Sequence, residues 1–278
     1  MFRFFRSKKA PPRPLRVAYD ILRMSAGGAN GGIKTHHYEF LRRLSEAHGR
    51  EISLAVLCRE EIVPELAFLS AGPANHILII GERGSRDFRE SDGTLPPLQF
   101  WPEPPSDFLE SLEIELLYAG FGFSRFHSPR IPQVSLIVDV LHRALPDTLD
   151  PAETAFRERW YREAIEKSAL VQTNSRFCVE ALCSGFDAPP EKLYHIYLPL
   201  HGRFNRIEMG SLPPELSPIP KRYFLYPANF WPHKNHRRLI EAYASYRETA
   251  PDAPYDLALT GHPDEPQGDL RRLVSEKS

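Results

Sequence analysis

Short apolar runs alternate with stretches of helical spacing along most of the chain. Strands are predicted at residues 15–18, 52–57, 76–80, 116–119, 134–141, 170–173, 223–227 and 256–260. A helix is predicted at about residues 35–47, where Phe40, Leu41 and Leu44 share one face. Strands that alternate with helices are typical of parallel sheets joined by right-handed crossovers. The pattern therefore predicts an α/β fold.

Two later helices have recognisable ends, and one long segment has no periodicity. Asp150, Pro151 and Glu153 resemble a capping box and predict a helix start. Ser175 is expected to cap a further helix, which Gly185 closes. Residues 81–106 are rich in Gly, Pro, Asp, Ser and Arg without an apolar period, which predicts a loop insertion.

The most informative stretch joins the predicted strand at residues 223–227 to a helix through the sequence Ala-Asn-Phe-Trp-Pro-His-Lys-Asn. Asn235 is a favourable N-cap residue, so we expect the helix to begin beside it. The first backbone N–H groups of a helix and its dipole attract an anion, and Lys234 adds a full positive charge directly before them. The arrangement predicts a phosphate site. For Lys234 taken by itself, an exposed lysine at a helix start is the simpler alternative.

This segment resembles the start of the C-terminal half of family 4 glycosyltransferases. In that family, a strand ending in Gly or Ala is followed by a Pro-[Arg/His]-Lys-Asn loop and an amphipathic helix. The matching positions are Ala228, Pro232, His233, Lys234, Asn235, Leu239, Ile240 and Ala242. The resemblance implies a GT-B fold with paired Rossmann-like domains, and transfer of a hexose from a UDP- or GDP-sugar with retention at the anomeric carbon. It also implies that Lys234 binds the donor diphosphate. The family often has an arginine shortly before this lysine, and we expect His233 and Asn229 to share its role.

A glycine-rich loop at residues 27–32 follows the first predicted strand, and glycine lets a backbone approach a ligand closely. Gly31, Gly32 and Ile33 are similar to the family's Gly-Gly-[Ile/Val] turn, which implies that both glycines contact the donor diphosphate. The loop lacks the Rossmann dinucleotide spacing and the Walker lysine. A simple chain reversal explains the loop equally well without the family. Gly261 matches a turn that faces the nucleotide in the family. The alternative is that Gly261 is an ordinary glycine at the end of a strand.

Residues 139–146 resemble the family's segment in which a strand is followed by Asp, a nearby His and a Pro. Asp139 lies near the carboxyl end of a predicted strand, where ligands gather in parallel sheets. The resemblance implies catalytic or acceptor-binding roles for Asp139 and His142. Many relatives have a His directly before the Asp, where this chain has Val138. Orienting a loop therefore remains the alternative role for both residues.

The expected domain organisation follows the same resemblance. It comprises a basic disordered leader at residues 1–14, an N-terminal Rossmann-like, acceptor-side domain at 15–205, a proline-rich linker at 206–221 and a partial nucleotide-sugar-binding domain at 222–278. Family members carry a Glu-x7-Glu motif beyond the equivalent of Lys234, and no such pair occurs after Lys234 in this sequence. A half sheet would expose an unpaired edge and an apolar face. We expect a fragment, a truncated product or a chain completed by another, lacking full activity. The alternative is a non-catalytic module that binds an acceptor or a partner.

The amino-acid composition of the chain argues against some classes of function. Lys and Arg total 35 against 36 for Asp and Glu, so no global positive field favours nucleic acid. The 3 cysteines have no metal-ligand spacing, which fits a reducing compartment such as the cytoplasm. We expect no metal and no cofactor, with the nucleotide sugar as co-substrate and a saccharide or lipid-linked saccharide as acceptor.

The first sixteen residues carry basic side chains and no acid. The basic residues are Arg3, Arg6, Lys8, Lys9, Arg13 and Arg16, interleaved with phenylalanines. A disordered leader is the simpler interpretation of this segment. The alternative is weak peripheral contact with anionic lipid at the inner membrane face.

Overall fold

The structure is a computed structural model that describes residues 13–28, 30–72, 75–81, 95–198, 222–250, 255–262 and 267–277. Most of the predicted leader, the linker at 206–221 and residues 82–94 of the predicted insertion lie outside the described residues. The chain divides into two compact units. The first comprises Met1–Met24, His36–Val140 and Arg157–Pro199, and the second Ser25–Thr35, Leu141–Phe156 and Leu200–Ser278.

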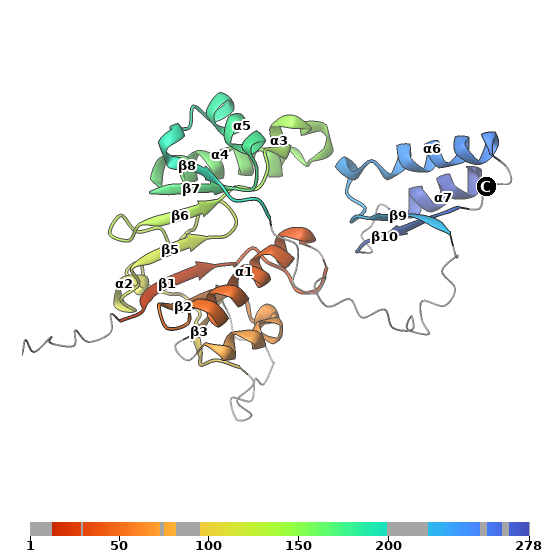
Figure 1. Cartoon of the computed structure of the whole chain (residues 1–278). Coiled ribbons are helices and arrows are strands. Elements are labelled where there is room, and N and C mark those ends of the chain that lie inside the picture. Colours follow the sequence, from red (N-terminus) through yellow and green to blue (C-terminus); the bar gives the residue numbers. More distant parts are fainter. Residues whose placement is uncertain are drawn as a thin grey trace, which may run out of the picture. The chain divides into compact units, whose positions relative to one another are not determined.

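The first unit is built on a parallel sheet of eight strands (Figure 1). In chain order these are β1 (Leu15–Asp20), β2 (Ile52–Cys58), β3 (His76–Ile80), β4 (Leu98–Trp101), β5 (Leu116–Ala119), β6 (Gln133–Leu136), β7 (Leu170–Thr173) and β8 (Leu193–His195). Every neighbouring pair is parallel. The predicted α/β class is confirmed, and the sheet is Rossmann-like.

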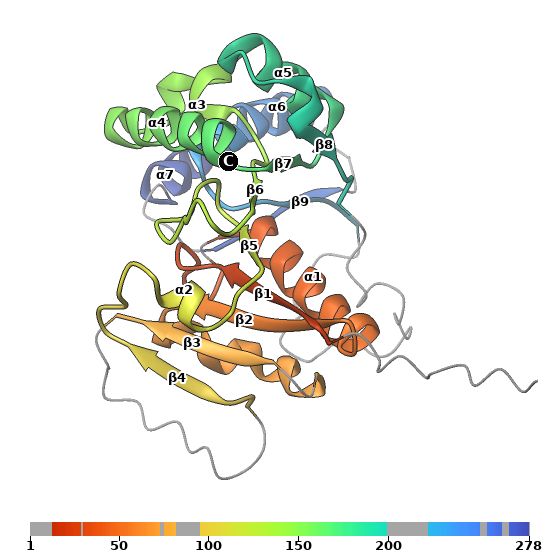
Figure 2. The ribbon, with the colours of Figure 1, turned by 90° about the vertical axis from the view of Figure 1, so that its left-hand side faces the viewer.

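The order of strands across the sheet is β4-β3-β2-β1-β5-β6-β7-β8. The chain builds outward from β1 to β4, as Figure 2 shows, and then returns to pair β5 with the other side of β1. The register of β1 and β5 runs from Val17 opposite Leu116 to Asp20 opposite Ala119. Open α/β sheets bind ligands outside the carboxyl ends of their strands at such a reversal of order. The carboxyl ends of β1 and β5 therefore mark the favoured edge of this sheet.

Helices connect the strands of the sheet. They are α1 (Gly32–His48), α2 (Phe108–Ser111), α3 (Leu141–Ala144), α4 (Pro151–Lys167) and α5 (Arg176–Phe186), with the 3-10 helices η1 (Glu60–Ala71), η3 (Pro146–Thr148) and η4 (Pro190–Lys192). On α1, Leu41 is fully buried, and the Phe40 ring lies 6.0 Å from Tyr19 of β1 and 5.6 Å from Tyr118 of β5. This apolar face holds α1 against the middle of the sheet.

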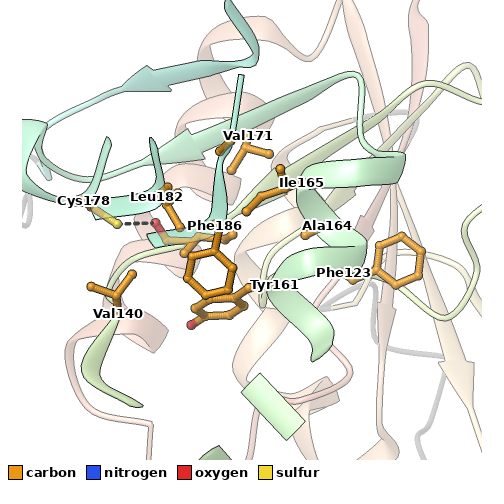
Figure 3. Packing of buried hydrophobic residues seen from close by; sticks show 11 residues of the cluster. Phe123, Val140, Tyr161, Ala164, Ile165, Val171, Cys178, Leu182 and Phe186 are labelled. Atoms are coloured by element: carbon orange, nitrogen blue, oxygen red, sulfur yellow. Dashed lines mark hydrogen bonds between the residues drawn. The ribbon is translucent and has the colours of Figure 1, made fainter. Parts of the chain in front are cut away.

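A second apolar core joins α4 and α5 to the sheet (Figure 3). Tyr161 and Ile165 of α4 and Phe186 of α5 are buried in it. The thiol of Cys178 donates to the carbonyl of Ile137 at 3.5 Å, the bond drawn in Figure 3. Ile137 and other residues just beyond β6 belong to this core, which explains why the predicted strand at 134–141 was too long. Their apolar character reflects burial under helices rather than strand pairing.

Two predictions at helix ends have opposite outcomes. Ser175 caps α5 as predicted, because its hydroxyl accepts the N–H of Cys178 at 3.2 Å. Gly185 does not close the helix, and that prediction is wrong. The helix continues to Phe186 and ends at Asp187, whose backbone is left-handed with φ 54° and ψ 34°. Aspartate tolerates this conformation better than most residues.

The second unit contains a pair of parallel strands, β9 (Tyr223–Pro227) and β10 (Asp256–Thr260). Its helices include η7 (Pro232–Lys234), α6 (His236–Thr249) and α7 (Gln267–Lys277), and α6 packs against α7. Phe224 of β9 lies 5.6 Å from the Tyr246 ring of α6. Among the described residues, the β9 side chains Tyr223, Phe224 and Leu225 remain exposed. No helix of the described chain is both long and apolar enough to cross a membrane.

Candidate functional site

A tight turn leads from β9 into α6 and fixes the backbone of Lys234. Pro232 opens η7, and the N–H of Lys234 donates to the carbonyl of Trp231 at 2.9 Å. The N–H of Asn235 donates to the carbonyl of Pro232 at 3.0 Å. The Tyr226 hydroxyl donates to the carbonyl of Lys234 at 2.8 Å. Lys234 is thus held directly before the first turn of α6.

Asn235 occupies the N-cap position of α6, so the helix begins beside it as predicted, although its side chain makes no cap bond. Its backbone is left-handed, with φ 54° and ψ 42°. A capping side chain normally reaches the second or third N–H from an extended backbone. Asparagine is among the few residues that tolerate the left-handed region, which suits the junction of η7 and α6. The first N–H groups of α6 consequently receive no bond from the side chain at the cap position.

The start of α6 is also cationic. Its first turn contains Arg237 and Arg238 and no acidic residue, and Lys234 precedes it. Each cation near a helix N-terminus is unfavourable by about 0.3–1 kcal/mol, because it faces the positive end of the dipole. An uncapped N-terminus with added positive charge is suited to an anion such as a phosphate.

His236, the first residue of α6, contributes packing rather than charge. It is 3% exposed, and its ring lies 5.1 Å from Tyr226 and 4.7 Å from Phe230. Burial lowers the pKa of His236 below its ordinary value, and the charge of Lys234 lowers it further. The imidazole is therefore neutral at pH 7. The burial of His236 was not predicted from the sequence. The nearby aromatic residues Tyr226 and Phe230 are the signal that could have indicated it.

The carboxyl ends of β9 and β10 are joined by close backbone packing. Asn229 follows β9, and its amide oxygen accepts the N–H of His262 at 3.0 Å. A Cβ added to Gly261 would lie 2.3 Å from the carbonyl oxygen of Ala228. This close approach explains the glycine without a ligand. Lys234, His233, Asn229 and Gly261 thus belong to one unit, and among these four predicted residues Lys234 carries the full positive charge.

The glycine loop that follows β1 belongs to the second unit. Gly27 and Gly31 have φ values of +72° and +56°, which L-residues with a side chain rarely adopt. Gly32 begins α1. Inside this unit, the amide nitrogen of Asn229 donates to the carbonyl of Gly28 at 3.3 Å. The predicted loop residues and the turn after β9 are thereby linked through one hydrogen bond.

Asp139 and His142 differ in their surroundings. Asp139 lies three residues beyond β6 and forms an ion pair with Arg157 of α4 at 3.3 Å, with the Asp139 side chain 47% exposed. His142 lies in α3 and is 2% exposed. The Asp139 carboxylate is thus half-exposed and ion-paired, whereas the His142 imidazole is enclosed.

Asp20, at the carboxyl end of β1, was missed because the strand was predicted to end at residue 18. The hydroxyl of Ser124 donates to one of its carboxylate oxygens at 2.5 Å, and the N–H of Leu22 donates to the other at 3.0 Å. Burial raises the pKa of Asp20, and these bonds oppose the increase. A buried carboxylate thus stands at the favoured edge of the sheet. An aspartate directly after an apolar strand is the signal that could have revealed it.

His37 of α1 is enclosed beside the same edge. Its Nδ1 shares a hydrogen bond of 2.8 Å with the Tyr19 hydroxyl, and its ring contacts Phe121 at 4.9 Å. Burial lowers the pKa of His37 to about 3, so the ring is neutral. A Cβ on Gly120 would lie 2.7 Å from the His37 ring. These contacts give His37 a packing role.

The comparisons with known proteins add no assignment. No protein-family model matches the chain, and a search of curated proteins finds no match.

Proposed function

We propose that the chain binds a nucleoside-diphosphate sugar at the start of α6 and derives from a retaining family 4 glycosyltransferase of GT-B fold. The donor is a UDP- or GDP-hexose, and the acceptor is a saccharide or lipid-linked saccharide. One observation carries the proposal: the N-terminus of α6 is uncapped and cationic, without an acidic residue in its first turn. A diphosphate would satisfy the N–H groups at this end and neutralise Lys234.

The same geometry suits the chemistry of the leaving group. When the bond between the anomeric carbon and the diphosphate breaks, negative charge grows on the departing phosphate oxygen. A fixed cation and backbone N–H groups aimed at that oxygen stabilise the transition state more than the ground state. In this proposal Lys234 and the first turn of α6 supply that stabilisation. Gly31 and Gly32 contact the diphosphate, and Asp139 contacts the acceptor.

The second candidate is a non-catalytic module that binds an acceptor or a partner. It is favoured by the ion pair of Asp139 with Arg157, because a carboxylate that already has a guanidinium partner 3.3 Å away serves a structural role without a substrate. Incubation with UDP-glucose or GDP-mannose and candidate acceptors separates the two functions. Release of UDP or GDP supports transfer, whereas binding without consumption supports the module.

The diphosphate site is tested by Lys234→Ala. Calorimetric titration with UDP and with GDP should show binding to the unaltered chain and an affinity about 10- to 100-fold lower in the variant, since a hydrogen bond to a charged group contributes about 1.5–3 kcal/mol. Lys167→Ala is the matched control, because Lys167 ends α4 and its ammonium is part of an ordinary helical ion pair. Equal affinity of Lys234→Ala and the unaltered chain would remove Lys234 from the site.

A further inference from the structure

A buried lysine lies under the glycine loop. Lys34 is the third residue of α1 and is only 6% exposed. Its ammonium donates to the carbonyls of Ser25 at 2.9 Å and Gly27 at 2.8 Å. A cation in the first turn of a helix opposes the helix dipole, and a buried ammonium loses its hydration. Both effects make a lysine unfavourable at this position, and its two hydrogen bonds to the loop offset part of that cost.

The loop needs such support because of its composition. Glycine loses more backbone freedom on ordering than any other residue, and Gly27 and Gly31 are held at positive φ. A side chain also braces the loop from within, since the amide oxygen of Asn30 accepts the N–H of Ser25 at 2.6 Å. Lys34 thus holds the carbonyls of Ser25 and Gly27, and Asn30 holds the N–H of Ser25. The backbone is thereby fixed before any ligand arrives.

We propose that Lys34 is a positioning residue, whose buried ammonium locks the glycine loop in the shape that receives the diphosphate of the nucleotide sugar. This inference rests on the proposed function, because it assigns the loop to the same ligand. Lys34 acts through the carbonyls of Ser25 and Gly27 and does not itself touch the ligand. A loop that holds its binding shape for only about a tenth of the time binds about tenfold more weakly.

The chain offers a matched control. The ammonium of Lys192 also donates to two backbone carbonyls, those of Ile165 at 3.1 Å and Glu166 at 3.0 Å, near the end of α4. Lys192→Met therefore also removes two ammonium-to-carbonyl bonds, but none in the glycine loop. Lys34→Arg restores a cationic donor and serves as the rescue variant.

The test combines amide hydrogen exchange with titration of UDP and GDP, on the full chain. Lys34→Met should exchange faster across residues 25–33 and bind nucleotide about tenfold more weakly, with Lys34→Arg recovering both properties. Lys192→Met should exchange faster near residues 165–167 and keep the original affinity. Unchanged loop exchange, unchanged affinity, or an equal loss of affinity in Lys192→Met would each overturn the inference.

The failure of this inference is distinguishable from that of the proposed function. If the unaltered chain binds neither UDP nor GDP, the proposed function fails, and the role of Lys34 in ligand binding fails with it. If Lys234→Ala weakens binding while Lys34→Met does not, the proposed function stands and only the positioning role of Lys34 is overturned.

Discussion

Reversing one charge at the start of α6 should have opposite effects on stability and on binding. In Arg238→Glu, an exposed cation in the first turn of α6 becomes an anion. Removing the cation relieves about 0.3–1 kcal/mol, and the new carboxylate gains about as much from the dipole. The free energy of unfolding should therefore rise by about 0.6–2 kcal/mol.

The same substitution should weaken nucleotide binding. A carboxylate beside the proposed diphosphate places like charges together, so the affinity for UDP should fall at least about tenfold. Thermal unfolding followed by circular dichroism, with and without UDP, measures both effects together. The free variant should melt higher than the unaltered chain, and UDP should raise its melting temperature less.

Arg247→Glu is the control from the opposite end of the same helix. Arg247 lies in the last turn of α6, where a cation interacts favourably with the dipole. This variant should destabilise the chain by a similar amount and leave UDP binding intact. Equal destabilisation by both substitutions, or full UDP affinity in Arg238→Glu, would refute the electrostatic reasoning.

Two further predictions concern the edge of the large sheet. Because burial raises the pKa of Asp20 above 3.8, its contribution to stability is complete below the unfolded pKa and declines as pH rises through the folded pKa. Asp20→Asn should therefore be more stable than the unaltered chain at about pH 7 and lose this advantage near pH 4, as measured by urea unfolding; an advantage that grows at acid pH would contradict this. Gly120→Ala should cost about 1–3 kcal/mol, because its Cβ would lie 2.7 Å from the His37 ring. The loss should shrink in a His37→Ala background, and an equal loss there would show that the clash is not the cause.

Strong apolar runs made most of the sheet predictable. The strands at residues 76–80, 116–119, 170–173, 223–227 and 256–260 were placed at their observed bounds, because each is a short apolar run bounded by turn residues. β4 and β8 were missed, since both are short strands at the edges of the sheet and are only partly buried. A short edge strand needs less apolar character, so periodicity alone gives little signal there.

The candidate site was predictable in residue type but not in geometry. The position of Lys234 before α6 follows from local sequence, as does the presence of Asn235 at the helix start. The left-handed backbone of Asn235, which removes its side-chain cap, depends on the turn of η7 into α6. The bonds of Lys34 to Ser25 and Gly27 and the pairing of Asp139 with Arg157 depend on how the chain folds back on itself in three dimensions. The spacing of apolar residues along the sequence does not predict such contacts.

The indole of Trp231 makes the turn before α6 optically addressable. Its ring centroid lies 5.5 Å from that of His233, and its carbonyl holds the backbone of Lys234. The chain has only 3 tryptophans, so replacing Trp101 and Trp160 by phenylalanine leaves Trp231 as the single tryptophan fluorophore, beside the proposed phosphate position. Emission from that fluorophore would follow local events at the turn in real time, including rapid-mixing experiments with unlabelled nucleotides.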